Sequence, residues 1–312
     1  MSQEIENQLN KIPVIKWVVR FLKSIQLPGL KGLSLYDLSE MYVLGIINGA
    51  LGIRASAVAF SFFMAIFPFL LFIIILMPYI PIESFQSDFL SLLEATLPPK
   101  TSDFFNQNIF ENINKKRSGG LLSSVFIVSM LLMSNGVNAV FSGFENSYHQ
   151  KLNRNFINQY LYAFGVSIIL VLILISTIIG FGFLEIYVLH PIYKSLNLGD
   201  ATSELEWLLR ALKFLFFVMM IYLVIAVLYF FGTKDGKLSR FFSVGALLTT
   251  LLILLNSFLF GIYIENFSTY NQLYGSIGAL LILLFYLWLN AIILLLGFEL
   301  NASLQRLKKS CQ

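Results

Sequence analysis

The sequence predicts an all-α integral membrane protein with six transmembrane helices. Two observations support this prediction: the composition of the chain and the order of its apolar and polar segments. Of the 312 residues, 57% are hydrophobic and only 12% are charged. A soluble domain carries about 25% charged residues, so this chain has roughly half that share. The apolar residues also gather in long runs between shorter polar segments. Lipid is therefore the expected solvent for most of the chain.

A transmembrane helix needs about 20 consecutive, mostly apolar residues. Six segments meet this requirement, and the first of them contains Pro68. The predicted spans are residues 54–80, 121–144, 156–188, 207–231, 241–264 and 276–304.

The lysines and arginines predict that both termini lie in the cytoplasm (N-in, C-in). Fourteen of the 21 basic residues fall in the segments that this topology places inside. Cytoplasmic loops carry such an excess, so the bias favours an even number of spans. The first seven residues lack the basic region and apolar core of a cleaved signal peptide. The first span is therefore expected to direct insertion.

Three regions follow from this topology. Residues 1–53 form a cytoplasmic N-terminal region, with an interfacial amphipathic helix over 8–26 and a second helix over 35–52. Residues 54–304 form the six-helix transmembrane domain. Its external loop, 81–117, has helical spacing of apolar residues and is expected to form one or two short helices. Residues 305–312 form a basic cytoplasmic tail.

The sequence offers no pattern for catalysis, a metal ion or a cofactor. The two histidines, His149 and His190, fall on opposite sides of the membrane in the predicted topology. Cys311 is the single cysteine, so no disulfide forms within the chain. Known hydrolase and phosphate-binding motifs are absent, and no basic run suggests nucleic acid. Membrane lipids are the expected partners. A homo-oligomer is compatible with the sequence, and no motif indicates a particular protein partner.

Polar side chains inside the predicted spans are the strongest candidates for a site. Asn135, Asn138 and Ser142 share one face of the second span. Tyr286 and Asn290 share one face of the sixth span. Two interpretations stay open, because both satisfy groups that are costly in lipid. The two faces form hydrogen bonds between helices, or they line an interior polar cavity.

The fifth span adds Asn256, which is expected to join that cavity if its helix borders it. Two charges form a separate candidate. Arg54 begins the first span, and Glu299 lies at a similar depth near the cytoplasmic end of the sixth. They could form a charge pair, or Glu299 could reach water or Arg306 instead.

Three sequence segments resemble those of a known family. Residues 57–68 are similar to the first-helix signature of the YihY/BrkB family of bacterial inner-membrane proteins, and residues 274–279 and 296–301 resemble its final-helix signature. Among the positions that depart from the family pattern are two phenylalanines. Phe298 stands where relatives have a small residue, and Phe141 stands where many have an asparagine.

The resemblance implies a multi-pass protein of the bacterial inner membrane without a settled activity. The family was once labelled ribonuclease BN, and one branch is described as a serum-resistance virulence factor. The leading expectation is a non-enzymatic protein that transports or handles a lipid or another amphipathic envelope molecule. The alternative is a structural or resistance-related envelope protein without transport. A membrane ribonuclease is the third reading, disfavoured because the acidic residues are sparse and scattered.

Overall fold

A computed structural model describes residues 21–24, 26, 34–76, 119–147, 150–151, 156–183, 203–232, 241–266 and 276–310. Its helices are α3 (Leu35–Asn48), α4 (Leu51–Leu76), α8 (Gly119–Glu145), α9 (Phe156–Phe183), α11 (Ser203–Gly232), α12 (Val244–Asn266) and α14 (Ser276–Ser310). Two short strands, β1 (Asn146–Ser147) and β2 (Gln150–Lys151), pair antiparallel after α8. The predicted helical class is confirmed.

Five of these helices, α8, α9, α11, α12 and α14, contain stretches that are long and apolar enough to cross a membrane. A sixth span results if α3 and α4, which meet at a bend of 65°, count as one. The predicted number of six therefore depends on this bent pair. Most of the predicted interfacial helix 8–26 and the whole external loop 81–117 lie outside the described residues.

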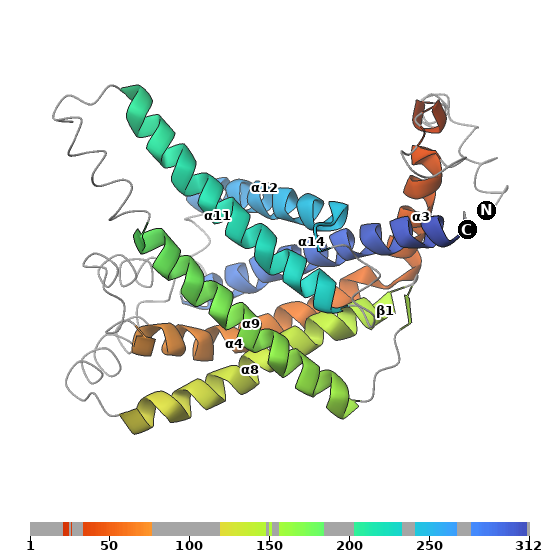
Figure 1. The fold of residues 1–312 in the computed structure, drawn as a ribbon. Coiled ribbons are helices and arrows are strands. Elements are labelled where there is room, and N and C mark those ends of the chain that lie inside the picture. The colour runs from red at the N-terminus through yellow and green to blue at the C-terminus, as the bar shows by residue number, and fades with distance from the viewer. Residues whose placement is uncertain are drawn as a thin grey trace.

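The helix predicted over 35–52 is present as α3, but it ends at Asn48, because the structure breaks the helix before α4 begins at Leu51. Ser34 caps the start of α3, and its backbone N–H donates to Asp37 Oδ2 at 2.8 Å. Gly49 ends the helix, and Ala50 takes a left-handed φ of 47°. Such a φ is incompatible with a continuous helix. The bend allows α3 to lie across the end of the bundle, against the last turns of α14 (Figure 1).

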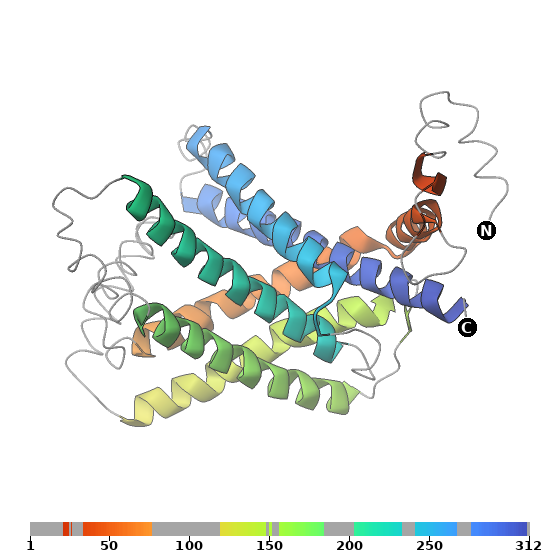
Figure 2. The same cartoon turned by 45° about the horizontal axis from the view of Figure 1, so that its top comes forward.

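Successive helices from α4 to α14 run in opposite directions (Figures 1 and 2). α4 packs between α8 and α14, α9 packs against α8 and α11, and α12 packs against α14. Small residues allow the closest approach of α8. A Cβ atom added to Gly143 would lie 3.1 Å from Leu295 Cδ2 of α14, and one added to Gly136 would lie 3.4 Å from Phe62 Cδ1 of α4. Helices associate in membranes mainly through such close contacts.

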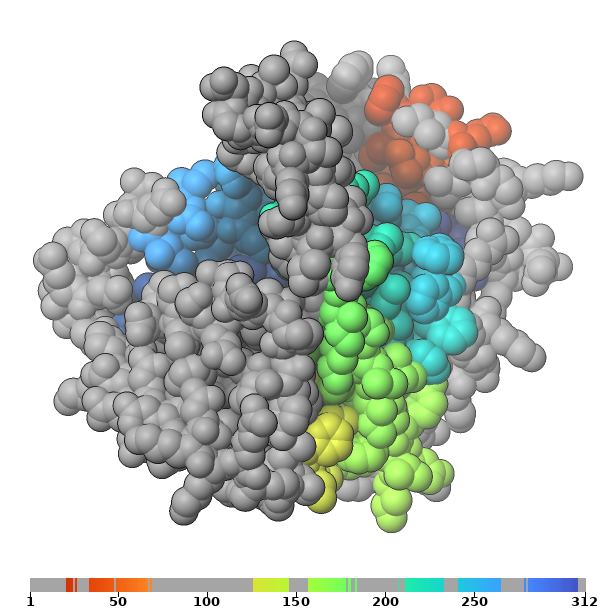
Figure 3. All heavy atoms as spheres, turned by 60° about the vertical axis from the view of Figure 1, so that its left-hand side comes forward, coloured from red at the N-terminus to blue at the C-terminus, as the bar shows by residue number. Residues whose placement is uncertain are grey.

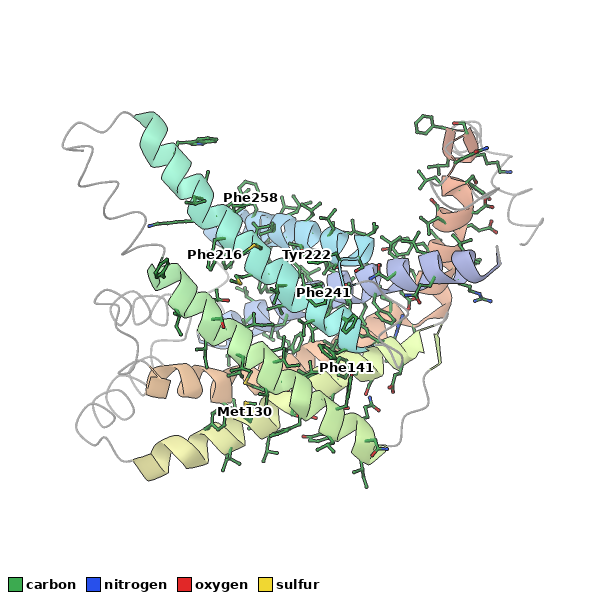
Figure 4. The ribbon with its side chains drawn as sticks, viewed as in Figure 1. Met130, Phe141, Phe216, Tyr222, Phe241 and Phe258 are labelled. Atoms are coloured by element: carbon green, nitrogen blue, oxygen red, sulfur yellow. The ribbon has the colours of Figure 1, made fainter. Side chains whose placement is uncertain are left out.

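The outward faces of the helices carry large apolar side chains. Leu172 of α9 is 57% exposed, Leu215 of α11 is 64% exposed and Phe258 of α12 is 67% exposed. Phe258 is labelled in Figure 4, and the side-by-side surfaces of α9 and α11 appear in Figure 3. A soluble monomer rarely exposes apolar patches of this extent. These faces suit contact with lipid tails.

Candidate functional site

A buried ion pair joins the beginning of α4 to the C-terminal half of α14. Arg54 Nη2 donates to Glu299 Oε1 at 2.7 Å. The Arg54 side chain is 7% exposed and that of Glu299 is 0% exposed. Ionisable residues within membrane segments are rare, and each is by default a candidate for function. Glu299 does not reach water, which was the alternative environment expected for it.

The Arg54 guanidinium also contacts α8. Its Nη1 donates to the Gly143 carbonyl at 2.9 Å. Gly143 lies in the last turn of α8, where carbonyl groups lack partners within the helix and a positive charge is favourable. Gly49 gives the guanidinium room, because a Cβ atom there would lie 2.7 Å from Arg54 Nη2. One side chain therefore links α4, α8, α14 and the bend after α3.

A second buried polar cluster joins α11, α12 and α14. The Tyr229 hydroxyl donates to the Leu294 carbonyl at 2.6 Å and lies 2.6 Å from Thr249 Oγ1. Because its single proton goes to the carbonyl, the Thr249 hydroxyl donates to the Tyr229 oxygen. Gly297 makes room for this pair, since a Cβ atom there would lie 2.5 Å from the Tyr229 hydroxyl. The three helices are thus held together by satisfied polar groups.

Asn301 of α14 completes the polar contacts at the start of α12. Its Oδ1 accepts from the backbone N–H of Gly245 at 2.9 Å, and its Nδ2 donates to Ser243 Oγ at 3.0 Å. Ser243 Oγ also accepts from the Ala246 N–H at 3.2 Å, as an N-cap side chain does. Two free N–H groups of the first turn are therefore satisfied, one of them by another helix.

An aromatic stack borders both polar clusters. The rings of Phe144 and Phe298 lie parallel, with centroids 4.0 Å apart and an interplanar angle of 5°. Tyr229 meets Phe144 edge-on at 5.6 Å. Phe141, labelled in Figure 4, lies 6.5 Å from Phe144 and 6.0 Å from Tyr162 of α9. Phe141 and Phe298, which depart from the family pattern, are thus buried rings of one cluster.

The polar residues named on the second span have different surroundings. Asn135 is exposed, and Asn138 and Ser142 are partly buried. Ser142 Oγ accepts from Gln159 Nε2 of α9 at 3.1 Å. The close packing of α8 through Gly136 and its neighbours turns a different face of that helix toward α4. The polar stripe of α8 is left at the edge of the contact.

The polar residues of α12 and α14 lie mainly between those two helices. Tyr286 shares a hydrogen bond of 2.7 Å with Ser257. Asn290 Nδ2 donates to the Tyr286 carbonyl of its own helix at 2.9 Å. Asn290 Oδ1 and Asn256 Nδ2 are buried without a hydrogen-bond partner among the described residues. The structure does not arrange the six predicted side chains around one space.

An apolar cavity of about 470 Å³ does lie among the helices, and one of those six residues lines it. α11 supplies six lining side chains, from Phe217 to Leu228, and α9 supplies four, from Leu170 to Thr177. α4, α8, α12 and α14 supply the remainder, including Asn290. Among the described residues that line it, every side chain except those of Thr177 and Asn290 is apolar.

Sequence reasoning missed Tyr229, Thr249 and Ser243. Tyr229 and Thr249 lie within apolar segments whose only evident feature is that they could cross a membrane. No local sequence pattern shows that the two side chains are in contact. Within the part of the chain that the structure describes, no group of three or more His, Cys, Asp or Glu residues could hold a metal ion. His149, His190 and Cys311 lie outside that part.

Antiparallel apolar helices, a buried ion pair and outward apolar faces define a helical integral membrane protein. Residues 50–311 match the sequence profile of the family described as virulence factor BrkB, and the chain belongs to this family. The recognition from the two helix signatures is thereby confirmed.

Relatives match along most of the chain. A putative ribonuclease-like protein, YfkH of Bacillus subtilis, is 28% identical over 256 residues, which cover 82% of this chain and 90% of that protein. A UPF0761 membrane protein of Mannheimia succiniciproducens is 27% identical over 264 residues, covering 82% and 86%. A UPF0761 membrane protein of Xanthomonas oryzae is 42% identical over 60 residues, covering 19% and 14%. No solved structure gives a significant match.

Proposed function

We propose that this protein is a non-enzymatic, multi-pass protein of the bacterial inner membrane that handles a lipid or another amphipathic envelope molecule. The observation that carries the proposal is the apolar cavity of about 470 Å³ among the helices. Its size falls within the range of about 300–1,000 Å³ that is typical of small-molecule sites. Its apolar lining suits an apolar ligand.

The test compares two substitutions on α9. Leu174 lines the cavity, whereas Leu172 is 57% exposed on the outer face of the same helix. Leu174→Trp fills the cavity, and Leu172→Trp adds the same bulk outside it. Protein is extracted in polymer-bounded membrane discs, and the retained lipids are identified by mass spectrometry.

We expect wild type and Leu172→Trp to retain a lipid that is enriched over the surrounding membrane. Leu174→Trp should reduce that enrichment about fivefold or more, with the melting temperature unchanged. If the lipids of the wild type merely mirror the bulk membrane, the protein does not select a lipid and the proposal fails.

The packed end of the bundle favours a second candidate, a structural envelope protein without transport. There the ion pair of Arg54 and Glu299 and the hydrogen bonds of Tyr229 join helices rather than bordering a space. The same two variants separate the candidates in cells. A cellular phenotype lost in Leu174→Trp but kept in Leu172→Trp favours lipid handling, whereas one kept in both favours the structural role.

The name of the Bacillus relative suggests nuclease activity as a further candidate function. Under our proposal we expect this protein to have no such activity. Glu299, the fully buried acid of α14, is already paired with Arg54. Purified protein should therefore leave RNA intact with Mg²⁺, Mn²⁺ or Zn²⁺, and the double variant His149→Ala, His190→Ala should behave identically. RNA cleavage that co-purifies with the wild type and disappears in the double variant would contradict this part of the proposal.

A further inference from the structure

We infer that α3 lies along the membrane surface and inserts the side chains of Val43 and Ile47 among the acyl chains of the leaflet that the basic residues predict to be cytoplasmic. In this arrangement α4 alone forms the first span, and α3 is an interfacial helix. The inference concerns the junction of α3 and α4, so it does not depend on the cavity or on lipid handling.

The direction of α3 differs from that of the spanning helices. α3 and α4 meet at a bend of 65°, whereas α4 runs along the bundle with its neighbours (Figure 1). α4 has 26 residues. Its length of about 39 Å exceeds the hydrocarbon thickness of about 30 Å, so α3 is not needed to complete the span. Because α4 follows the bundle, the axis of α3 lies closer to the membrane plane than to its normal.

The exposed apolar side of α3 points away from its buried side. Leu38 and Gly45 are buried, and α14 is the main partner of α3 among the described helices. Val43 and Ile47 lie about 140° and 180° around the helix from Leu38. They are 49% and 70% exposed. α3 therefore packs on the bundle with one side and presents valine and isoleucine on the other.

The two remaining sides of α3 differ in polarity. Asp37 and Glu40 lie about 60° apart, between the buried and the exposed apolar sides. Leu35, Tyr42 and Ile46, all partly buried, lie on the opposite side. A helix in the plane of the membrane has such a pattern, with acidic residues toward water and apolar residues toward the hydrocarbon core. The flank that carries Val43 and Ile47 then lies at the level of the lipids.

The exposed face of α4 continues this apolar flank. Ile53, Phe60 and Met64 are exposed and fall within about 40° of one another around α4. On a helix that crosses the membrane, such a face is in contact with lipid tails. Ile53, which is 76% exposed, lies in the first turn of α4, and Ile47 lies in the last turn of α3. Lipid contact is therefore expected on both sides of the bend.

A cation at the beginning of α3 favours lipid as the partner of this flank. Tyr36 lies on the same side of α3 as Val43 and Ile47, and Lys23 Nζ lies 5.0 Å from the centroid of its ring. Lys23 is exposed, and so is Phe21. Basic side chains beside exposed apolar ones suit anionic headgroups above acyl chains. In water the same apolar side chains would be unfavourably exposed.

The experiment measures the surroundings and depth of single nitroxide spin labels. Cysteines replace Val43, Ile47 or Glu40 of the full-length protein in a Cys311→Ser background, and the labelled proteins are placed in nanodiscs that contain anionic lipid. Collisions with oxygen, which concentrates in lipid, are compared with those of a water-soluble nickel chelate. Phe60→Cys on the exposed face of α4 is the lipid reference, and Arg306→Cys at an exposed position of α14 is the aqueous reference.

We expect oxygen collisions to exceed nickel collisions several-fold at Val43 and Ile47, with the order reversed at Glu40. Val43 and Ile47 should differ in depth by less than about 3 Å, because a helix along the membrane normal would separate them by about 6 Å. Each labelled protein must keep the melting temperature of the unlabelled background. If Glu40→Cys melts lower, the aqueous reference at Arg306 replaces it in the comparison.

Three results would overturn the inference. Nickel collisions that dominate at Val43 and Ile47 would place this flank in water. Weak collisions with both reagents would show that protein covers the flank, either a second copy or another segment of this chain. A depth that increases from Val43 to Ile47 by the full 6 Å or so expected along the normal would make α3 part of the first span. None of these results bears on the lipid-handling proposal, which the variants of Leu174 and Leu172 test separately.

Discussion

Arg54 brings a full positive charge into the helical bundle, and its surroundings compensate that charge with two acceptors. Glu299 supplies the opposite charge at 2.7 Å, and the Gly143 carbonyl supplies the negative end of α8. Arg54 Nε remains buried with no hydrogen-bond partner among the described residues. In a site of low dielectric the attraction within a pair roughly offsets its desolvation, whereas a single uncompensated charge is strongly destabilising. The pair therefore matters chiefly because neither partner tolerates the loss of the other.

This asymmetry predicts the outcome of a double-mutant cycle. Arg54→Leu and Glu299→Leu should each lower the free energy of unfolding by about 3–5 kcal/mol, because each leaves a buried charge alone. The double variant should recover part of that loss, with a coupling of about 1–3 kcal/mol. Thermal melting in detergent measures all four proteins. Arg306→Leu, at an exposed position of α14, is the control and should change stability by less than about 0.5 kcal/mol. Strictly additive losses would show that the two charges are not coupled.

At the scale of the helices, the pairing of α12 with α14 depends on two glycines that face each other. A Cβ atom on Gly297 would lie 2.8 Å from the Gly245 carbonyl oxygen and 2.5 Å from the Tyr229 hydroxyl. The hydrogen bonds of Tyr229 with Leu294 and Thr249 need this close approach. Small residues at a helix contact are the usual means of association in lipid, where apolar burial between helices gives little gain.

Gly297→Ala should therefore destabilise the protein by about 2 kcal/mol or more, because an added methyl group forces the two helices apart. Gly261 of α12 is the matched control, since a Cβ atom there meets nothing within 4 Å. Gly261→Ala should be neutral or stabilising by up to about 1 kcal/mol, as expected from helix propensity alone. Melting temperatures of both variants in the same detergent provide the comparison. Equal effects of the two substitutions would argue against a close contact at Gly297.

For the whole molecule, the alternating helices imply that segments of odd and even order end on opposite sides of the bundle (Figure 1). From the excess of basic residues we expect the side of α3 and of the last turns of α14 to face the cytoplasm. Three positions between spans test this orientation: Ser195, Ser268 and Gly236, all of which lie outside the described residues.

Single cysteines at these positions, in a Cys311→Ser background, should react differently with a membrane-impermeant thiol reagent applied to intact spheroplasts. Ser195→Cys and Ser268→Cys should be labelled from outside, and Gly236→Cys should be labelled only after the membrane is disrupted. Permeabilised cells control for the reactivity of each site. Reversed labelling at two of the three positions would contradict the N-in, C-in topology.

The sequence by itself determined the membrane class and the helical segments, because a span needs only a sufficient length of apolar residues and every neighbour in lipid is similarly apolar. The starts of α9 and α14, at Phe156 and Ser276, coincide with their predicted positions. The similar depth of Arg54 and Glu299 was also readable from the order of spans. The break at Gly49–Ala50 was not, since it depends on the left-handed φ of Ala50, a conformation that alanine rarely adopts and that its residue type does not predict.

Only the tertiary structure decided which face of each helix meets a neighbour. The stripe of Asn135, Asn138 and Ser142 looked like an inward face, because polar side chains are costly in lipid. The glycine face of α8 packs inward instead, since close contact between backbones yields more dispersion energy than a polar stripe of one helix can gain alone. The position of Asn290 beside the cavity likewise depends on the tertiary structure, because side chains from six helices line that cavity and no single segment determines how they are spaced.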